Sequence, residues 1–325
     1  MHLIIAEKHD AAKRIARILA GGKPKSLRVA GVEAFQFDDR VVLGLSGHIV
    51  GIDYPQGYNN WQKVDCKDLI RAEIVVRPIQ EKIISALHKL GKEADRVTIA
   101  TDYDREGELI GVEALKIVEE AKPKIKADRV RYSAIVKDEI IKAFQDSGSV
   151  DYELAASGEA RQIIDLVWGA ALTRYISLTS GRLGKEFLSV GRVQSPTLAL
   201  IVDREKEIQS FVPQPYWEIY ADLEKELRVQ HAKGRIWEKS EVDGIVSRLG
   251  PEGIIKSIES KQRIDRPPAP FDTTSFIAAA SGIGLSAANA MRIAEWLYTN
   301  GFISYPRTDN TVYPPSIDLT GLTRQ

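Results

Sequence analysis

Cysteine, net charge and long apolar runs are what this sequence has least of. Its 325 residues include one cysteine, Cys66, which excludes an intramolecular disulfide and every cysteine-rich zinc module. Basic and acidic residues number 45 each, so the overall charge does not indicate a nucleic-acid binder. Any metal must therefore be held by carboxylates or histidines, which favours Mg²⁺, and any polyanion must be bound locally.

The sequence also lacks a run of about 18 apolar residues, and its N-terminus, MHLIIAEKHD, does not have the layout of a signal peptide. Hydrophobic residues make up 44% of the chain and charged residues 28%, enough for a sizeable core and more than one domain. We therefore expect a cytoplasmic, globular, multidomain protein without a membrane segment.

The first 150 residues alternate between strand-like and helical patterns, which predicts an α/β domain with a largely parallel sheet covered by helices on both faces. The predicted strands are 3–6, 41–45, 97–102 and 128–134, and the predicted helices are 10–19, 106–121 and 137–144.

A helical region follows, with helical patterns in 159–176 and 196–208. The segments 216–223, 227–237 and 253–260 then alternate like strands of an antiparallel sheet. Prolines in RPPAPFD (266–272) predict a linker or hinge. Two helices, 273–280 and 287–298, surround a glycine turn, an outline that fits a helix-turn-helix unit and also a plain helical hairpin. We expect domain boundaries at 1–148, 149–212, 213–266 and 267–325.

The stretch ATDYDREGE (100–108) places Asp102, Asp104 and Glu106 at alternate positions after an apolar strand and before a helix. Such acids repel one another unless a cation or raised pKa values relieve the crowding. A solvated acidic helix start is the other interpretation. Glu7 also ends a predicted strand, and ligands of parallel sheets bind at the carboxyl ends of strands, which favours Mg²⁺-assisted phosphate chemistry.

Four basic residues follow Glu7 in the sequence. Lys8 shares the strand end with Glu7 and could hold a phosphate beside a metal. Lys13, Arg14 and Arg17 lie on the following helix, where a solvated face is the simpler interpretation.

GFISYPRTDN (301–310) raises the question of a nucleophile. Pro306 restricts the backbone of Tyr305 and predicts a loop or strand edge, while Arg307 could donate to a phosphate. A phenol needs nearby positive charge or a base before it attacks phosphorus. Taken alone, this tyrosine would be interpreted as a core or surface residue.

Taken together, the motifs resemble those of the type IA DNA topoisomerases in the archaeal type I or type III style. Glu7-Lys8 and DYDREGE (102–108) resemble the family's Toprim domain, and GFISYPRTDN resembles its active-site tyrosine motif. Five further stretches follow the family's order: LSGHIVGID (45–53), EARQIIDLVWG (159–169), SVGRVQSPTL (189–198), FVPQPYW (211–217) and RPPAPFDTTSF (266–276).

The resemblance implies a mechanism. Tyr305 would attack a phosphate of single-stranded DNA to give a 5′-phosphotyrosyl link, with Glu7 as general acid and base. Lys8 and Arg307 would stabilise the phosphate. By the same resemblance, Asp102, Asp104 and Glu106 would hold Mg²⁺.

The resemblance also implies DNA contacts from Arg161, Arg192, Gln194 and Ser195. Asp165 would orient a base or an arginine, or form only a surface ion pair, and His48 would be structural or contact DNA. The expected activity is ATP-independent relaxation or decatenation by a monomer acting on single-stranded or negatively supercoiled DNA, with the proline segment as a hinge.

One feature departs from the family. Only 20 residues (325 minus 305) follow Tyr305, whereas family members continue much further, so we expect an N-terminal fragment of a longer protein. A Toprim-type nuclease or primase-like enzyme and a non-catalytic single-stranded-DNA-binding fragment remain alternatives. Reverse gyrase is disfavoured because the sequence has no GxxxxGK[ST] loop.

Overall fold

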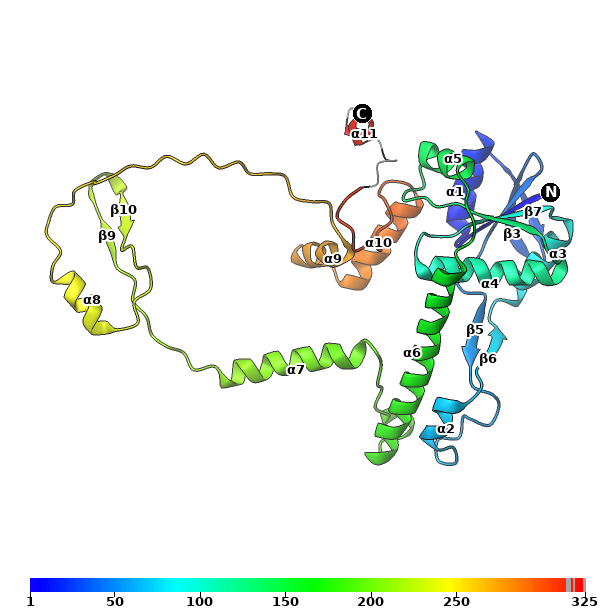
Figure 1. Cartoon of the computed structure of the whole chain (residues 1–325), viewed down its shortest axis with the longest axis horizontal. Coiled ribbons are helices and arrows are strands. Elements are labelled where there is room, and N and C mark those ends of the chain that lie inside the picture. The colour runs from blue at the N-terminus through cyan, green and yellow to red at the C-terminus, as the bar shows by residue number, and fades with distance from the viewer. Residues whose placement is uncertain (314–316, 318, 324–325) are drawn as a thin grey trace. The chain divides into compact units, whose positions relative to one another are not determined.

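A six-stranded sheet organises the first half of the chain in the computed structural model (Figure 1). The structure describes residues 1–313, 317 and 319–323. The chain divides into two units, one made of Met1–Arg192 with Pro268–Gln325 and the other of Val193–Pro267.

The sheet has the strand order β2-β3-β4-β1-β7-β8. Its strands are β1 (His2–Ala6), β2 (Lys25–Val29), β3 (Val32–Phe37), β4 (Arg40–Gly44), β7 (Arg96–Ala100) and β8 (Lys126–Arg129). The four strands β4, β1, β7 and β8 are parallel, whereas β2 and β3 add an antiparallel edge. A largely parallel sheet is therefore confirmed, and the β2-β3 hairpin is an addition that periodicity did not predict.

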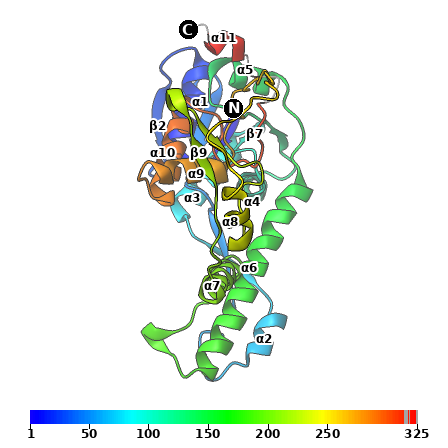
Figure 2. The same ribbon diagram turned by 90° about the vertical axis from the view of Figure 1, so that its left-hand side faces the viewer.

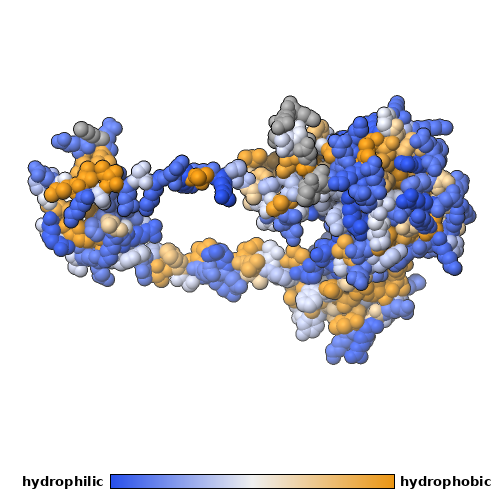
Figure 3. All heavy atoms as spheres, turned by 45° about the horizontal axis from the view of Figure 1, so that its top comes forward, coloured by the Kyte–Doolittle hydropathy of each residue, from blue (hydrophilic) through white to orange (hydrophobic). Residues whose placement is uncertain are grey.

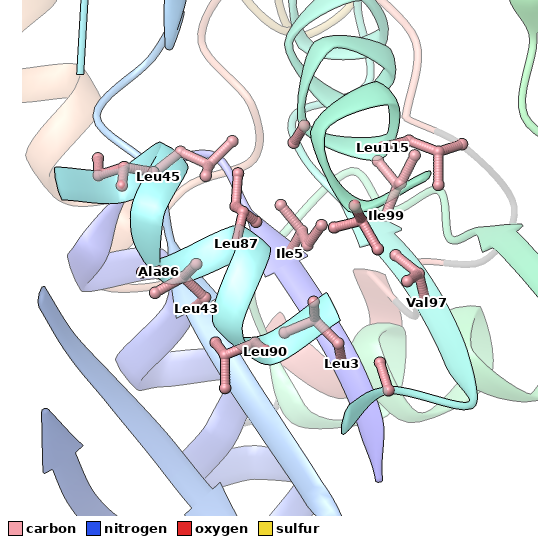
Figure 4. Close-up of a cluster of buried hydrophobic side chains, with 14 of the residues drawn as sticks. Leu3, Ile5, Leu43, Leu45, Ala86, Leu87, Leu90, Val97, Ile99 and Leu115 are labelled. Atoms are coloured by element: carbon pink, nitrogen blue, oxygen red, sulfur yellow. The ribbon is translucent and has the colours of Figure 1, made fainter. Parts of the chain in front are cut away.

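Helices cover both faces of this sheet. They are α1 (His9–Ala20), α3 (Glu81–Glu93), α4 (Arg105–Ala121) and α5 (Lys137–Gln145). Leu3 and Ile5 point to one face and pack against Leu87 and Leu115 from α3 and α4 (Figure 4). Ile4 and Ala6 point to the opposite face and pack against α1 and α5. This alternation along one strand buries both faces, as parallel sheets require.

A long helix, α6 (Tyr152–Thr179), leaves the sheet beside α4, and Figure 2 shows α2 (Cys66–Arg71) along its far part. The two-stranded sheet of β5 (Val50–Asp53) and β6 (Val75–Pro78) connects α2 to the main body, and a short 3₁₀ turn, η1 (Gly184–Glu186), follows α6. In Figure 3 hydrophilic residues cover much of the visible sheet-bearing body, while apolar residues gather in its lower part, above a hydrophilic tip. A helical region after the sheet domain is thus confirmed.

The tyrosine-bearing segment packs on the sheet domain through α10 (Ala287–Thr299), and α9 (Thr273–Gly282) packs against α10. The helix α11 (Leu319–Thr323) follows later in the chain. Side-chain caps from Asp272 and Ser286 begin the first two helices. These helices form a bent pair with an angle of 117°. Tyr298 from α10 is 2% exposed and enters the same hydrophobic cluster as Ile4 and Ala6.

The second unit contains α7 (Gln194–Ser210), β9 (Tyr220–Asp222), η2 (Glu224–Glu226), β10 (Arg228–Gln230) and α8 (Lys239–Val246). β9 and β10 pair antiparallel, as expected for this region. The predicted third strand, 253–260, is wrong: it has no regular secondary structure, and Ile254, Ile255 and Ile258 are exposed. An alternating pattern forms a strand only where a neighbouring strand is available for pairing.

Two other expectations concern the whole chain. No single helix among the described residues is long and apolar enough to cross a membrane, and α9 with α10 would pass that test only jointly, despite the bend between them. The four predicted domain boundaries remain predictions. The two compact units divide the chain in another way: α6 and α7 fall in different units, and residues 268–325 join the sheet-bearing unit.

Candidate active site

Two neighbouring parallel strands bring Glu7 and the 102–108 loop to one edge of the sheet. Ala6 of β1 pairs with Ala100 of β7, so both loops begin at the same level. The backbone nitrogen of Asp102 donates to Glu7 Oε2 at 3.3 Å. The strand-end glutamate and the acidic loop therefore lie together, as the sequence predicted.

Buried contacts fix the shape of this loop. Asp104 begins α4, and its Oδ1 accepts a 2.7 Å hydrogen bond from the Gly107 nitrogen. Gly107 approaches the backbone so closely that a Cβ there would lie 2.2 Å from the Asp102 carbonyl oxygen. Arg129, which is fully buried, donates to that carbonyl at 2.8 Å and to Glu108 Oε2 at 2.7 Å. Sequence reasoning missed Arg129, whose one signal was a charge inside a strand-like run.

Asp102 is the most buried of the predicted metal ligands, at 3% exposure. Its Oδ1 accepts a 2.9 Å hydrogen bond from the hydroxyl of Tyr298. Burial, and next the carboxylate of Glu7, raise the pKa of Asp102 to about 7, against the opposing effects of Lys8 and Tyr298. The site therefore holds a carboxyl group that carries a proton much more readily than an ordinary aspartate.

Lys8 is surrounded by three carboxylates. Its Nζ lies 3.4 Å from Glu7 Oε1 and 3.6 Å from Asp102 Oδ2, and it donates to Glu295 Oε1. Burial works to lower the pKa of Lys8, but the carboxylates outweigh it and the pKa is raised. Lys8 is therefore a firmly charged ammonium at the end of β1.

Glu295 is a site residue that sequence reasoning missed. Its Oε2 is buried without a hydrogen-bond partner in the described part of the chain and lies 3.7 Å from Arg307 Nε. Glu295 thus stands between the two cations predicted to bind phosphate, Lys8 and Arg307. Its spacing of three residues from Tyr298 puts both on one face of α10, a pattern that could have indicated a shared target.

Tyr305 lies at this cluster, on a loop as predicted. Its backbone nitrogen donates to Ser133 O at 2.8 Å, and its hydroxyl donates to Asp104 Oδ2. Its ring packs edge-on against Tyr298, with 5.2 Å between centroids. Burial, then the charge of Asp102 and the hydrogen bond to Asp104, raise the pKa of the Tyr305 phenol far above its ordinary value. The phenol is therefore neutral in this arrangement.

A cavity of about 990 Å³ opens at Tyr305. Asp104, Arg105, Tyr305 and Arg307 contribute to its lining, together with residues of the segment 270–274. Arg307 is 63% exposed there. The cavity gives the tyrosine, its proton acceptor and a guanidinium access to the same space.

Glu106 belongs to a second polar cluster. Its Oε1 accepts from Arg161 Nη1 at 3.0 Å, and its Oε2 lies 3.2 Å from His48 Nε2. The pKa of His48 is raised, mainly by its hydrogen bond to Glu113 and further by Glu106, although burial alone would lower it. The structure thus joins Glu106 with His48 and Arg161, and no hydrogen bond in the described residues joins it to Asp102 or Asp104.

The remaining predicted DNA-contacting residues divide between the units. Arg192 forms a two-point contact with Asp165, at 2.7 Å from Nε and 3.2 Å from Nη2. That contact, chiefly, lowers the pKa of Asp165. Gln194 and Ser195 lie in the first turn of α7 in the second unit.

A bound Mg²⁺ is compatible with the chemistry of the site, although no three His, Cys, Asp or Glu side chains in the described residues are grouped to hold a metal. Glu7, Asp102 and Asp104 offer the carboxylate oxygens that Mg²⁺ prefers. Glu7, Asp102 and Glu295 also outnumber the one ammonium that they surround. This excess of negative charge favours a cation.

Two family models match the chain. One, described as a Toprim domain, matches residues 2–135, and the other, described as DNA topoisomerase, matches residues 149–324. Together they include the acidic loop, the helical region and Tyr305.

Individual relatives agree. The chain is 50% identical to DNA topoisomerase 1 of Archaeoglobus fulgidus over 98% of its length and 48% of the relative's, and 46% identical to that of Thermoplasma acidophilum over 99% and 42%. The solved structure of full-length topoisomerase I from Thermotoga maritima matches with a TM-score of 0.71 and 28% identity, over 96% of this chain and 50% of that one. The chain thus spans about half the length of these relatives.

The two matched models lie in the order expected from the motifs, and the second alone covers more than half of the chain. The chain belongs to the type IA DNA topoisomerase family.

Proposed function

We propose that this chain carries the strand-cleavage site of an ATP-independent type IA DNA topoisomerase, with Tyr305 as the nucleophile. The contact that carries the proposal is the hydrogen bond from the Tyr305 hydroxyl to Asp104, beside Lys8, Glu7 and Asp102. A tyrosine that had only a packing role would not require its hydroxyl to meet a carboxylate at the ligand-binding edge of a parallel sheet.

The proposed step exchanges one phosphoester for another. The Tyr305 oxygen attacks a backbone phosphorus, the bond from phosphorus to the 3′ oxygen breaks, and the phenol's proton passes to Asp104, which already accepts its hydrogen bond. The departing 3′ oxygen takes a proton from Glu7, which returns as the base when the strand is rejoined. Because the phosphotyrosyl link keeps the energy of the original ester, rejoining needs no ATP.

Cations near the tyrosine suit the charge that develops on the phosphate. Lys8 and Arg307 would neutralise it, and for Lys8 this means exchanging the Glu295 carboxylate for a phosphate oxygen. Mg²⁺, held by Asp102 and Asp104, would supply further electrostatic stabilisation. Glu106 would join these ligands only after leaving His48 and Arg161.

DNA would approach along the helical region. Arg161 and Arg192 are suited to backbone phosphates, with Asp165 holding both guanidiniums in place. His48, close to Glu106, would contact the same strand. Gln194 and Ser195, at the start of α7, would also contact DNA.

The proposal extends to the whole protein. Single-stranded or negatively supercoiled DNA would be the substrate, relaxation or decatenation the outcome, and a cytoplasmic monomer the acting form. The proline segment 266–272 would allow the tyrosine-bearing helices to move away from the sheet while a strand passes.

The decisive experiment incubates the chain and Mg²⁺ with a 3′-end-labelled single strand and separates the products on a denaturing gel. The chain should retain label, because the 5′ phosphate of the labelled piece is joined to Tyr305. Tyr305→Phe should abolish this adduct. Tyr152→Phe, which removes the hydroxyl of an exposed tyrosine at the start of α6, should leave it unchanged.

Other outcomes would favour the alternatives. Cut strands without a covalent adduct would indicate a Toprim-type nuclease. Binding without cleavage would indicate a non-catalytic DNA-binding fragment. An adduct that survives Tyr305→Phe would overturn the assignment of the nucleophile.

A further inference from the structure

A second cavity, of about 610 Å³, lies between α1 and α10 in the sheet-bearing unit. We call it the α1–α10 cleft and define it by Lys13, Arg14, Arg17, Lys137, Trp296 and Asn300. It is separate from the Tyr305 cavity, with which it shares no lining residue. Neither the mechanism above nor the predicted DNA contacts use it.

Charge in the cleft is strongly one-sided. Lys13, Arg14, Arg17 and Lys137 line it, and Asp10 is the one acidic residue of the lining. In a chain with equal numbers of acidic and basic residues, such a local excess is not explained by composition. The cleft is therefore suited to an anion with more than one negative charge.

Most of these cations lack a close partner. Within the described residues, the side chains of Lys13, Arg17 and Lys137 form no hydrogen bond or ion pair, although Lys13 interacts electrostatically with the carboxylate of Glu33. All three side chains are exposed. Arg14 differs, since its Nε donates to Ile135 O at 2.6 Å and burial lowers its pKa. Three exposed ammonium and guanidinium groups thus surround one arginine that is held in place. Interpreting the Lys13, Arg14 and Arg17 face as merely solvated does not account for this convergence with Lys137.

An aromatic ring shares the cleft with these cations. Trp296 lines it and is 59% exposed. The indole stacks on Phe302, at 6.0 Å between centroids and 28° between planes, and Phe302 is itself 69% exposed. Exposed, stacked rings beside cations are typical of proteins that bind unpaired bases, because any base can stack on an aromatic face.

We propose that the α1–α10 cleft binds a segment of single-stranded nucleic acid, with phosphates at Lys13, Arg17 and Lys137 and an unpaired base on Trp296. Cations alone would also suit an acidic peptide or an anionic surface, but the exposed tryptophan favours a ligand that has both phosphates and bases. The choice of nucleic acid rests on the proposed function, whereas the cleft itself lies outside the cleavage site.

Binding here would be coupled to the position of the tyrosine. One wall of the cleft is α1, which follows Lys8, and the other is α10, where Glu295 faces Lys8 and the next residue is Trp296. A strand that touches both walls would hold α10 against the sheet domain. It would therefore oppose the separation of Tyr305 from the acids.

Photo-cross-linking tests the site directly. An oligothymidylate containing 5-iododeoxyuridine is bound to the Tyr305→Phe chain, irradiated, digested and mapped by mass spectrometry. Trp296 should carry the adduct. Trp296→Ala should weaken binding of the oligonucleotide at least about fivefold, and Trp296→Phe should recover part of the loss, because stacking depends on an aromatic face.

Charge reversal provides an independent measurement. Log affinity falls as log salt rises, and each phosphate contact on a single strand contributes about 0.7 to the steepness of that fall. The double variant Lys13→Glu, Arg17→Glu loses two contacts and should therefore make the fall shallower by about 1.4. Lys82→Glu, Lys116→Glu makes the same charge change on exposed positions of α3 and α4 and should not alter the slope.

Several results would overturn the inference. One is a cross-link confined to other residues, and another is an equal response to both charge-reversal pairs. Equal retention of polyglutamate by wild type and Trp296→Ala, with no preference for the oligonucleotide, would indicate a general anion surface. If wild type forms the Tyr305 adduct but Trp296 does not cross-link, the inference fails alone. A Trp296 cross-link in a chain that never cleaves DNA would instead support binding at the α1–α10 cleft and contradict the cleavage proposal.

Discussion

The hydroxyl of Tyr298 donates a 2.9 Å hydrogen bond to Asp102 Oδ1, joining α10 to the acidic loop across 196 positions of the sequence. Both partners are buried, Tyr298 at 2% exposure and Asp102 at 3%. This contact, together with that between Tyr305 and Asp104, ties the tyrosine-bearing segment to two carboxylates of one loop. Separating the segment from the sheet therefore requires two phenol-carboxylate hydrogen bonds to break.

Replacing Tyr298 by phenylalanine should destabilise the chain by about 1 kcal/mol, because a buried acceptor loses its donor while the ring's packing remains. Urea unfolding measures this loss. Tyr152→Phe is the matched control, since Tyr152 is 57% exposed and its substitution should change stability by less than about 0.5 kcal/mol. Equal effects of the two substitutions would show that the buried hydrogen bond adds nothing to stability.

Asp102 should make stability depend on pH in a direction opposite to that of most aspartates. Its folded pKa of about 7 lies above the unfolded value, so the folded state binds more protons between roughly pH 4 and 7. The contribution of this group is fully present below about pH 4 and is lost as pH rises through 7. In Mg²⁺-free buffer with a chelator, the wild type should therefore lose stability over this interval relative to Asp102→Asn.

The comparison needs urea midpoints of both chains at several pH values between 4 and 8. Asp138→Asn, at an exposed position, should follow the wild type throughout. If Asp102→Asn runs parallel to the wild type, burial does not raise the pKa of Asp102 as stated.

The sheet and the strand-end acids were predictable because their signals are local. Apolar runs such as 3–6 and 97–102 have the length and flanks of buried strands, and the carboxyl ends of neighbouring parallel strands necessarily meet. Glu7 and Asp102 could thus be brought together without knowing any other contact. The motif around Tyr305 was equally visible, but only the family resemblance connected it to acids some 200 positions away.

Other features depend on contacts that leave no local pattern. Glu295 and Tyr298 occur on an amphipathic helix whose charges would ordinarily face solvent, so their contacts with Lys8 and Asp102 follow only from how α10 docks. Arg129 is fully buried. Because charged residues are rarely buried, the sequence gives no reason to expect this position inside the domain. The strand predicted at 253–260 was wrong for the opposite reason: the alternating pattern was present, but no neighbouring strand was available to pair with it.

Gly107 should tolerate no side chain. A Cβ would lie 2.2 Å from the Asp102 carbonyl oxygen, which is backbone and is already held by Arg129. Gly107→Ala should therefore destabilise the chain by about 1 to 3 kcal/mol, as overpacked sites do, and should displace the loop that carries the acids. Gly22→Ala, where nothing lies within 4 Å, is the control and should be neutral or slightly stabilising. Unfolding in urea compares them, and a neutral Gly107→Ala would contradict the close approach.

Glu295 should restrain the two cations that the phosphate needs. It accepts a hydrogen bond from Lys8 and lies 3.7 Å from Arg307, so a DNA phosphate must compete with its carboxylate for both. Glu295→Gln removes the charge while keeping the shape and an acceptor. In the Tyr305→Phe background, where no strand is cut, the substitution should tighten binding of a short single strand by about three- to tenfold at low salt. The gain should shrink as salt is raised.

The control and the cleavage assay separate this role from a general effect of charge. Glu93→Gln makes the same change at an exposed position of α3 and should leave the affinity unaltered. Lys8→Ala combined with Glu295→Gln should remove most of the gain, because the freed ammonium is then missing. With Tyr305 intact, tighter binding of the uncleaved strand need not speed cleavage, since only contacts that strengthen in the transition state do so. Weaker binding by Glu295→Gln would instead mean that Glu295 holds Lys8 where the phosphate needs it.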